Sequence, residues 1–148
     1  MRRLFFLMLV GVATLGLPGC GAGKHKQAAE ALANDFYRAF SANDWDSALN
    51  LYGPEFFEKT TKDQWQTTLM GIREKVGAHQ SHEVKGWQHK SRVGTGGSKQ
   101  TTVLTLQVSY ASAVTTETLT FLSSAEKGLR IVGHNIQLPS PKSPPAGP

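Results

Sequence analysis

Apolar residues recur at helical spacing near the start of the presumed folded region. Leu32, Phe36 and Phe40 stand at i, i+4 and i+8, and small alanines flank them. This pattern is typical of an amphipathic helix that buries one stripe. The spacing therefore predicts a helix over residues 27–41.

Two further helices follow. Asn43 or Asp44 can cap a short helix that runs through Leu51 and stops at Gly53-Pro54. We expect its buried contacts to be Trp45, Leu49 and Tyr52.

The third helix has both a start and a stop signal. Thr61 and Gln64 fit a capping box, and Gly77 follows the last apolar position. The residues between them form one apolar stripe, namely Trp65, Leu69, Ile72 and Val76.

After Gly77 the apolar period changes to two, which indicates strands. Strands are predicted near 81–93, over 103–110, over 115–123 and over 129–138, with a hairpin loop at 94–97 and a turn at 124–128. In the last strand, Val132, His134 and Ile136 compete with Leu129, Ile131 and Gly133 for the inner face. Alternation alone leaves this choice open.

Three helices followed by about four antiparallel strands predict an α+β fold, with the helices packed on one face of a curved sheet. A chain of 148 residues suits one such domain, which we place at residues 28–138.

The first twenty residues have the pattern of a secretory signal peptide: two arginines, an uncharged stretch from Leu4 to Leu17, and a small-residue end. The uncharged stretch of 14 residues would span about 21 Å as a helix, less than the roughly 30 Å of a bilayer core. It is too short for a stable membrane span.

The ending Leu17-Pro18-Gly19-Cys20 resembles the lipobox of bacterial lipoprotein signal peptides. That resemblance implies a signal peptide over 1–19 and a lipid (palmitate among its acyl chains) on Cys20, the only cysteine. Gly21 follows where retained inner-membrane lipoproteins carry Asp, so the resemblance implies an outer-membrane anchor with the domain in the periplasm, if the organism has two membranes.

Polar segments flank the domain. Residues 20–27 have no periodicity and predict the lipidated cysteine and a flexible tether, and residues 139–148 form a Pro-rich tail that we expect to be disordered. Five of the 16 basic residues lie in the leader, tether and tail, which leaves 11 against 11 acidic residues in the domain. The composition therefore argues against nucleic-acid binding.

The order of elements resembles the nuclear transport factor 2-like cone, also called ketosteroid isomerase-like or cystatin-like. More narrowly, several short pieces are similar to a family of exported bacterial proteins of unknown function with this fold. These pieces are Asn43-Asp44-Trp45, Asp63-Gln64-Trp65, Ile72-Arg73, Val76-Gly77, Glu117-Thr118-Leu119 and Ile131-Val132-Gly133. The resemblance implies a pocket between helices and sheet but no assigned chemistry.

Glu117 is the acidic residue most in need of explanation. Alternation places it on the inner side of its strand with Leu119 and Phe121, where an unpaired charge costs several kcal/mol. Arg73 flanks the buried stripe of the third helix, so we predict a structural Arg73–Glu117 ion pair.

The candidate pocket residues are Tyr37, Tyr110, Phe121 and His134. Some relatives of the cone fold use an inward carboxylate with an oxyanion tyrosine. Tyr37 lies one residue off the Phe36 stripe, and the sequence offers no second acid or base, so no catalytic residue is assigned. An isomerase or dehydratase that uses an inward carboxylate is the alternative.

His79 and His82 lack carboxylate or cysteine companions at ligand spacing, which favours solvated histidines over a metal site. No metal or cofactor is expected. Trp87, on the least regular strand, is expected to be exposed.

Together these patterns predict a lipid-anchored envelope protein. Its cone-like domain is expected to bind a ligand or a protein and to catalyse no reaction. The expected partners are the membrane, through the lipid, and a small apolar ligand or another envelope protein. A homodimer that pairs through the sheet is a further possibility that the fold resemblance implies.

Overall fold

The structure is a computed structural model that describes residues 20–95 and 97–139. Within these residues the chain forms four helices and then four strands: α1 (Cys20–Ala42), α2 (Trp45–Asn50), α3 (Pro54–Phe57), α4 (Lys62–Val76), β1 (His79–Gly94), β2 (Gly97–Tyr110), β3 (Val114–Ser124) and β4 (Gly128–Gln137). The predicted signal peptide (1–19) and all of the predicted tail but Pro139 lie outside the described residues.

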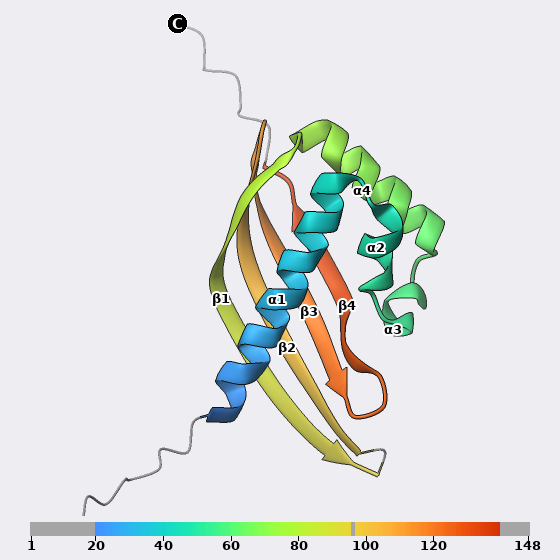
Figure 1. Cartoon of the computed structure of the whole chain (residues 1–148), viewed down its shortest axis with the longest axis vertical. Coiled ribbons are helices and arrows are strands. Elements are labelled where there is room, and N and C mark those ends of the chain that lie inside the picture. Colours follow the sequence, from blue (N-terminus) through green and yellow to red (C-terminus); the bar gives the residue numbers. More distant parts are fainter. Residues whose placement is uncertain (1–19, 96, 140–148) are drawn as a thin grey trace, which may run out of the picture.

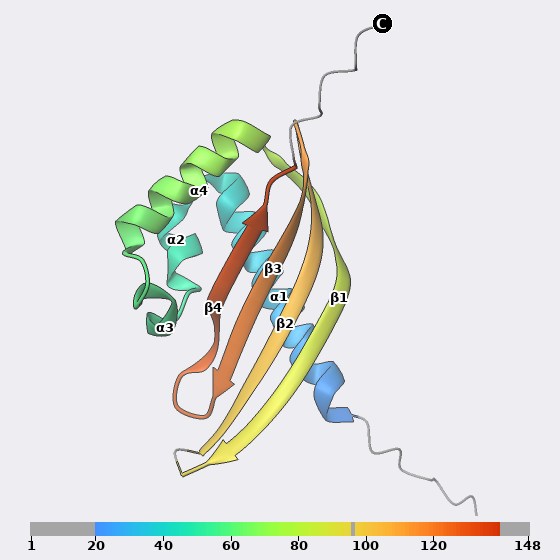
Figure 2. The same cartoon turned by 180° about the vertical axis from the view of Figure 1, so that it is seen from behind.

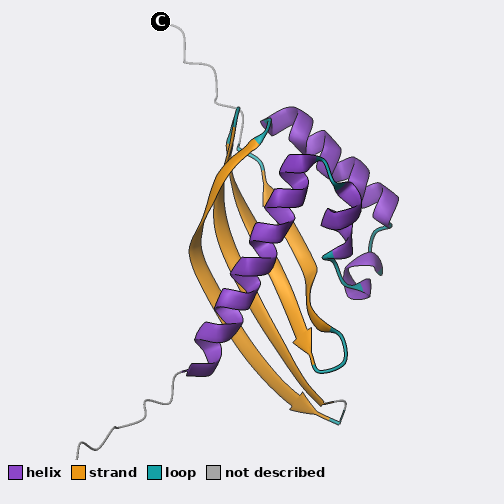
Figure 3. Ribbon diagram, viewed as in Figure 1, coloured by secondary structure: helices purple, strands orange, loops and turns teal. Residues whose placement is uncertain are grey.

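The predicted α+β fold is confirmed. The strands form one antiparallel sheet in the order β1-β2-β3-β4. α1 crosses one face of this curved sheet, and α2, α3 and α4 gather beside it toward β4 (Figure 1). From behind, no helix crosses in front of the strands (Figure 2), and the division into helical and strand layers is clear in Figure 3.

α1 buries two adjacent rows of side chains. In the predicted row Phe36 and Phe40 are each 1% exposed, and Leu32 is partly buried. Ala29, Ala33 and Tyr37 stand at i, i+4 and i+8 in a second row and are equally buried. The two alanines let the helix approach the sheet closely, so the tyrosine hydroxyl reaches β3.

The prediction of a flexible tether over 20–27 is wrong, because α1 begins at Cys20. Two contacts favour helix in this first part. Lys26 pairs with Glu30 one turn later at 2.7 Å, and the His25 ring stacks on His89 of β1 with centroids 4.6 Å apart.

The short segment after α2 is held by the sheet edge. Asp44, one of the two predicted caps, caps α2 by accepting a hydrogen bond from the Ser47 amide. Tyr52 then forms an isolated parallel bridge with Ile131 of β4. α3, which the sequence did not predict, follows because Pro54 fits the first turn of a helix.

α4 has the predicted bounds. Thr61 and Gln64 form the full capping box, and Gly77 ends the helix with a φ of 82°, a conformation that favours glycine. No helix among residues 20–95 and 97–139 is long and apolar enough to cross a bilayer.

A bulge in β4 settles which of its side chains point inward. Thr120 pairs with Gly133 and Phe121 with Ile131, so Val132 is an extra residue. Alternation changes phase there, and both Ile131 and His134 face the helices. Each of the two competing sequence patterns was therefore right for one part of the strand.

Candidate functional site

The carboxylate of Glu117 lies at the centre of the buried polar residues. The side chain is 0% exposed, in agreement with the predicted inward position. β3 places it between Thr115 and Leu119 on the face that the helices cover. A charge at this depth is stable only when hydrogen bonds replace its hydration.

Four donors surround this carboxylate. Oε1 accepts hydrogen bonds from the hydroxyls of Tyr110 at 2.7 Å and Thr115 at 2.9 Å. Oε2 accepts one from the Tyr37 hydroxyl at 2.8 Å and lies 3.1 Å from Nε2 of His134. A carboxylate has about four lone-pair sites, so every acceptor position of Glu117 is filled.

These contacts determine the charge of the site. Burial alone raises the pKa of Glu117, but the contact with His134, followed by the tyrosine hydroxyls, outweighs it and holds the pKa below its ordinary value of 4.5. Burial and the adjacent carboxylate raise the pKa of Tyr37 and of Tyr110. The tyrosines therefore remain protonated donors and Glu117 remains an anion at neutral pH.

His134 connects this cluster to a second tyrosine. Its Nδ1 lies 2.7 Å from the Tyr52 hydroxyl, and its side chain is fully enclosed. One assignment satisfies both contacts: the Tyr52 hydroxyl donates to Nδ1, and the Nε2–H donates to Glu117. Burial raises the pKa of Tyr52, which is consistent with its role as a donor.

A cavity of about 370 Å³ adjoins His134 and lies between α3, α4 and β4. Its walls are mainly apolar and aromatic, with Phe56, Trp65 and Val132 among them, and Lys59, Thr60 and Thr68 also line it. The Trp65 indole nitrogen is buried and makes no hydrogen bond within the described residues. The cavity thus adjoins His134, whose fully enclosed ring contacts Glu117.

The predicted Arg73–Glu117 pair is wrong. Arg73 instead donates to the backbone carbonyl oxygens of Phe40 and Ser41 at the end of α1, and its guanidinium lies over the Phe40 ring. The Phe40 oxygen also accepts a hydrogen bond from the Asn43 amide at 3.3 Å, and both carbonyls lie at the negative end of the helix, which attracts a cation. Four other side chains contact Glu117 in place of Arg73, namely Tyr37, Tyr110, Thr115 and His134.

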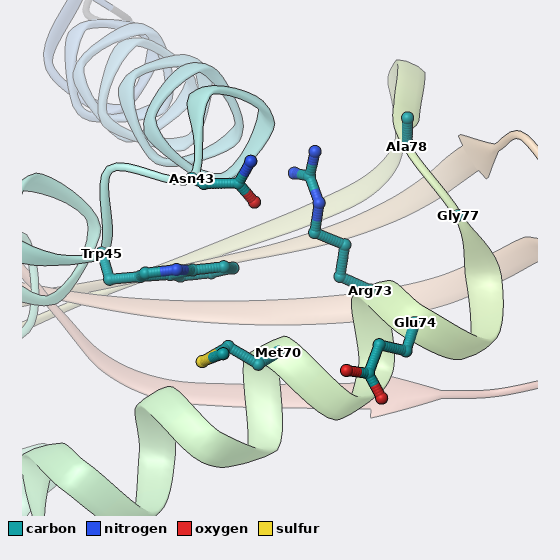
Figure 4. A pocket seen from close by; sticks show the side chains of 7 residues that line it. All are labelled: Asn43, Trp45, Met70, Arg73, Glu74, Gly77 and Ala78. Carbon is teal, nitrogen blue, oxygen red and sulfur yellow. The ribbon is translucent and has the colours of Figure 1, made fainter.

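Arg73 lines a separate cavity of about 510 Å³ between the end of α1, the start of α2 and the end of α4. Figure 4 shows the Trp45 ring between Asn43 and Met70, with Arg73 beyond the edge of the ring and the Glu74 carboxylate pointing away. Met70 is 42% exposed. This cavity lies at the opposite end of α1 from Cys20 (Figure 1).

The other predicted pocket residues are distributed between cluster and core. Tyr37, Tyr110 and His134 meet at Glu117, whereas Phe121 is fully buried in the hydrophobic core. Thr115 was not predicted as a site residue, and Tyr52 was expected only as a buried contact of the second helix, but both belong to the cluster. Thr115 stands two residues before Glu117, and same-face spacing in a strand is the signal that identifies it.

His79 and His82 are not solvated as predicted. Both are half-buried and their rings stack on Tyr37, with centroids 4.8 and 4.4 Å away. Burial lowers the pKa of each below 6.5. Trp87 is 41% exposed, as predicted. Within the described residues no group of three or more His, Cys, Asp or Glu side chains is arranged to hold a metal ion.

Comparison with known proteins adds little to this picture. No protein-family model and no curated protein matches the chain. A solved structure of Bd1075 from Bdellovibrio bacteriovorus aligns with 79% of this chain and 41% of its own, at a TM-score of 0.49 and 12% identity. The chain therefore spans about two fifths of the length of that structure. Helices packed on an antiparallel sheet are compatible with a nuclear transport factor 2-like fold.

Proposed function

We propose that this protein is a lipid-anchored lipoprotein of the bacterial cell envelope, attached through Cys20, whose nuclear transport factor 2-like domain binds a small apolar ligand without catalysis. The single observation that carries the non-catalytic part is the saturation of Glu117 by four donors. A general base needs a free lone pair within reach of its substrate. Glu117 has neither a free acceptor position nor solvent access, which argues against the isomerase or dehydratase alternative.

The cavity beside His134 supports a small ligand as the bound partner. Its volume falls within the roughly 300–1,000 Å³ of small-molecule sites, and its walls are mainly apolar. The outer face of the sheet is less suited to a protein partner or a second copy. Its centre carries Thr105, Thr118 and Thr120, and the large apolar residues exposed within the described chain are dispersed rather than gathered there.

The binding part is tested with the neutral apolar dye Nile red, titrated into the full-length protein in detergent below its critical micelle concentration. Wild-type protein should bind one equivalent saturably. Thr68→Trp places an indole in the cavity. It should weaken binding at least about tenfold, because the dye can then no longer contact the apolar walls. Thr67→Trp is the matched control, because the neighbouring Thr67 does not line this cavity. Equal affinity in both variants, or no saturable binding, would overturn the ligand proposal.

The anchor is tested separately with Cys20→Ser. The wild-type protein should partition into the detergent phase at the mass of a cleaved, acylated chain, and the variant should retain its leader and lose the acyl mass. An unchanged mass and unchanged partitioning would exclude lipidation at Cys20 while leaving the cavity proposal intact.

A further inference from the structure

The first strand begins with two histidines whose ring nitrogens face each other. Nε2 of His79 lies 3.1 Å from Nδ1 of His82. Three residues apart in a regular strand, their side chains would point to opposite faces. A register shift between His79 and Ser81 puts both on the helix-covered face, opposite Tyr110 and Val108 respectively.

The other nitrogen of each ring is directed at an oxygen. The Ser41 hydroxyl donates to the Tyr37 carbonyl oxygen at 2.7 Å, so it can only accept from Nδ1 of His79, 3.4 Å away. Nε2 of His82 lies 2.7 Å from Oδ1 of Asn34 and donates to it. Both neutral rings thus carry their proton on the outer nitrogen.

The two facing nitrogens are then both unprotonated, and two lone pairs stand 3.1 Å apart with nothing between them. A cation shared by both nitrogens, or a proton carried by one of them, relieves this repulsion. If the proton lies on Nε2 of His79, that nitrogen donates to Nδ1 of His82. Nδ1 of His79 then faces the Ser41 hydroxyl without receiving a hydrogen bond, because that hydroxyl donates to the Tyr37 carbonyl oxygen. Burial lowers the pKa of both histidines, which disfavours a second proton on either ring.

The spacing fits a metal ion. With metal–nitrogen bonds of about 2.0–2.1 Å, nitrogens 3.1 Å apart subtend about 100° at a shared metal, between the angles of square-planar and tetrahedral coordination. Metal-binding histidines usually donate their second nitrogen to a fixed oxygen, as Ser41 and Asn34 allow here. A cavity of about 200 Å³, lined by His82, Asn34 and Glu30 among others, adjoins His82 and has room for water.

We propose that His79 and His82 form a two-imidazole site for a divalent transition-metal ion, with water in the remaining positions. Imidazole pairs favour Cu²⁺, Ni²⁺ and Zn²⁺ over the hard cations Mg²⁺ and Ca²⁺. Both histidines stack on the Tyr37 ring, whose hydroxyl donates to the Glu117 carboxylate. This carboxylate adds negative charge near the site. The site is independent of the function proposed above.

The test is a titration of the metal-stripped full-length protein with Cu²⁺ and with Zn²⁺, followed by calorimetry, and for Cu²⁺ by electron paramagnetic resonance. We expect one equivalent bound and a nitrogen splitting from two imidazoles. His79→Gln and His82→Gln should each weaken binding at least about tenfold, and Asn34→Ala, which removes only the orienting oxygen, by about 10–100-fold.

His25→Gln and His89→Gln are the matched controls, because that pair is stacked ring on ring and should leave the titration unchanged. Circular dichroism establishes that each variant is folded. The proposal is overturned by the absence of stoichiometric binding in the wild type, or by equal losses in the control variants. If the ligand variants fail to fold, the wild-type spectrum and Asn34→Ala still decide the matter.

Discussion

Nε2 of His134 lies 3.1 Å from Oε2 of Glu117, although the two residues belong to different strands and both side chains are fully enclosed. The pair is the junction of a network that ties α1, β2, β3 and β4 together. Through Nδ1, His134 also holds Tyr52, the residue that bridges the helical segment to β4. The network is therefore as much a device that fixes the helices on the sheet as a chemical site.

The first prediction concerns the charge at the centre of this network. Glu117→Gln keeps the shape but replaces an acceptor oxygen with a donor amide, which leaves two of the four surrounding donors without an acceptor. We expect a loss of about 3–5 kcal/mol in the free energy of unfolding, measured by urea denaturation. Glu83→Gln, an exposed carboxylate on β1, is the control and should change stability by less than about 0.5 kcal/mol.

The second prediction is the pH dependence of that stability. The pKa of Glu117 is lower in the folded protein than in the unfolded chain, so the unfolded state binds the proton more tightly. The contribution of Glu117 to the free energy of unfolding is therefore full above about pH 4.5, and it is lost as the pH falls through the folded-state pKa. Urea midpoints between pH 7 and pH 3 should fall steeply for the wild type and more gently for Glu117→Gln.

Glu55 provides an internal reference for that measurement. Its hydrogen bond to Arg130 lowers its pKa to about 2, so it also contributes to acid loss of stability. Because Glu55 is present in both proteins, the difference between the two curves isolates Glu117. Parallel curves would contradict the assignment of an ionised Glu117.

Much of the fold could be read from local signals in the sequence. The capping box at Thr61 and the glycine at 77 gave the bounds of α4, and simple alternation placed Glu117 inside. These signals are local because a cap or a strand face depends on a few neighbouring residues.

The partners of Glu117 could not be read in the same way. Tyr37 stands beside the obvious apolar row of α1, and its burial follows from a second row whose members, Ala29 and Ala33, are too small to stand out as a stripe. His134 faces inward because of the bulge at Val132, and a bulge has no fixed sequence signature. Arg73 reaches the carbonyl oxygens at the end of α1 rather than the carboxylate, which only the placement of α4 beside that end of α1 reveals.

The third prediction uses two glycines with opposite roles. A Cβ on Gly53 would lie 2.5 Å from Cδ of Arg130 and 2.7 Å from Oε2 of Glu55, which bond each other in a bidentate pair. Gly53→Ala should therefore lower the free energy of unfolding by about 1–3 kcal/mol. Gly71, inside α4, has open space around its Cβ position, so Gly71→Ala should raise it by about 0.5–1 kcal/mol. Thermal or urea unfolding of the two variants checks both signs, and a neutral Gly53→Ala would show that Arg130 moves aside at little cost.

The fourth prediction separates the tyrosines by what their hydroxyls contact. Tyr37→Phe removes a donor from Oε2 of Glu117, and we expect a loss of about 1.5–3 kcal/mol at neutral pH, the range for hydrogen bonds to charged groups. The same change raises the pKa of Glu117 because one of the bonds that lowers it is gone. The part of the acid loss of stability that Glu117 causes should consequently be smaller than in the wild type and complete at a higher pH, because the folded-state and unfolded-state pKa values lie closer together.

Tyr52→Phe is the matched control for this effect. Its hydroxyl contacts His134 rather than Glu117, so the variant should lose stability at neutral pH while keeping the acid transition close to that of the wild type. Urea midpoints measured across the same pH range distinguish the two variants. If Tyr37→Phe and Tyr52→Phe shift the acid transition equally, the Tyr37 hydroxyl does not lower the pKa of Glu117. Its contact with the carboxylate then contributes packing but no charge stabilisation.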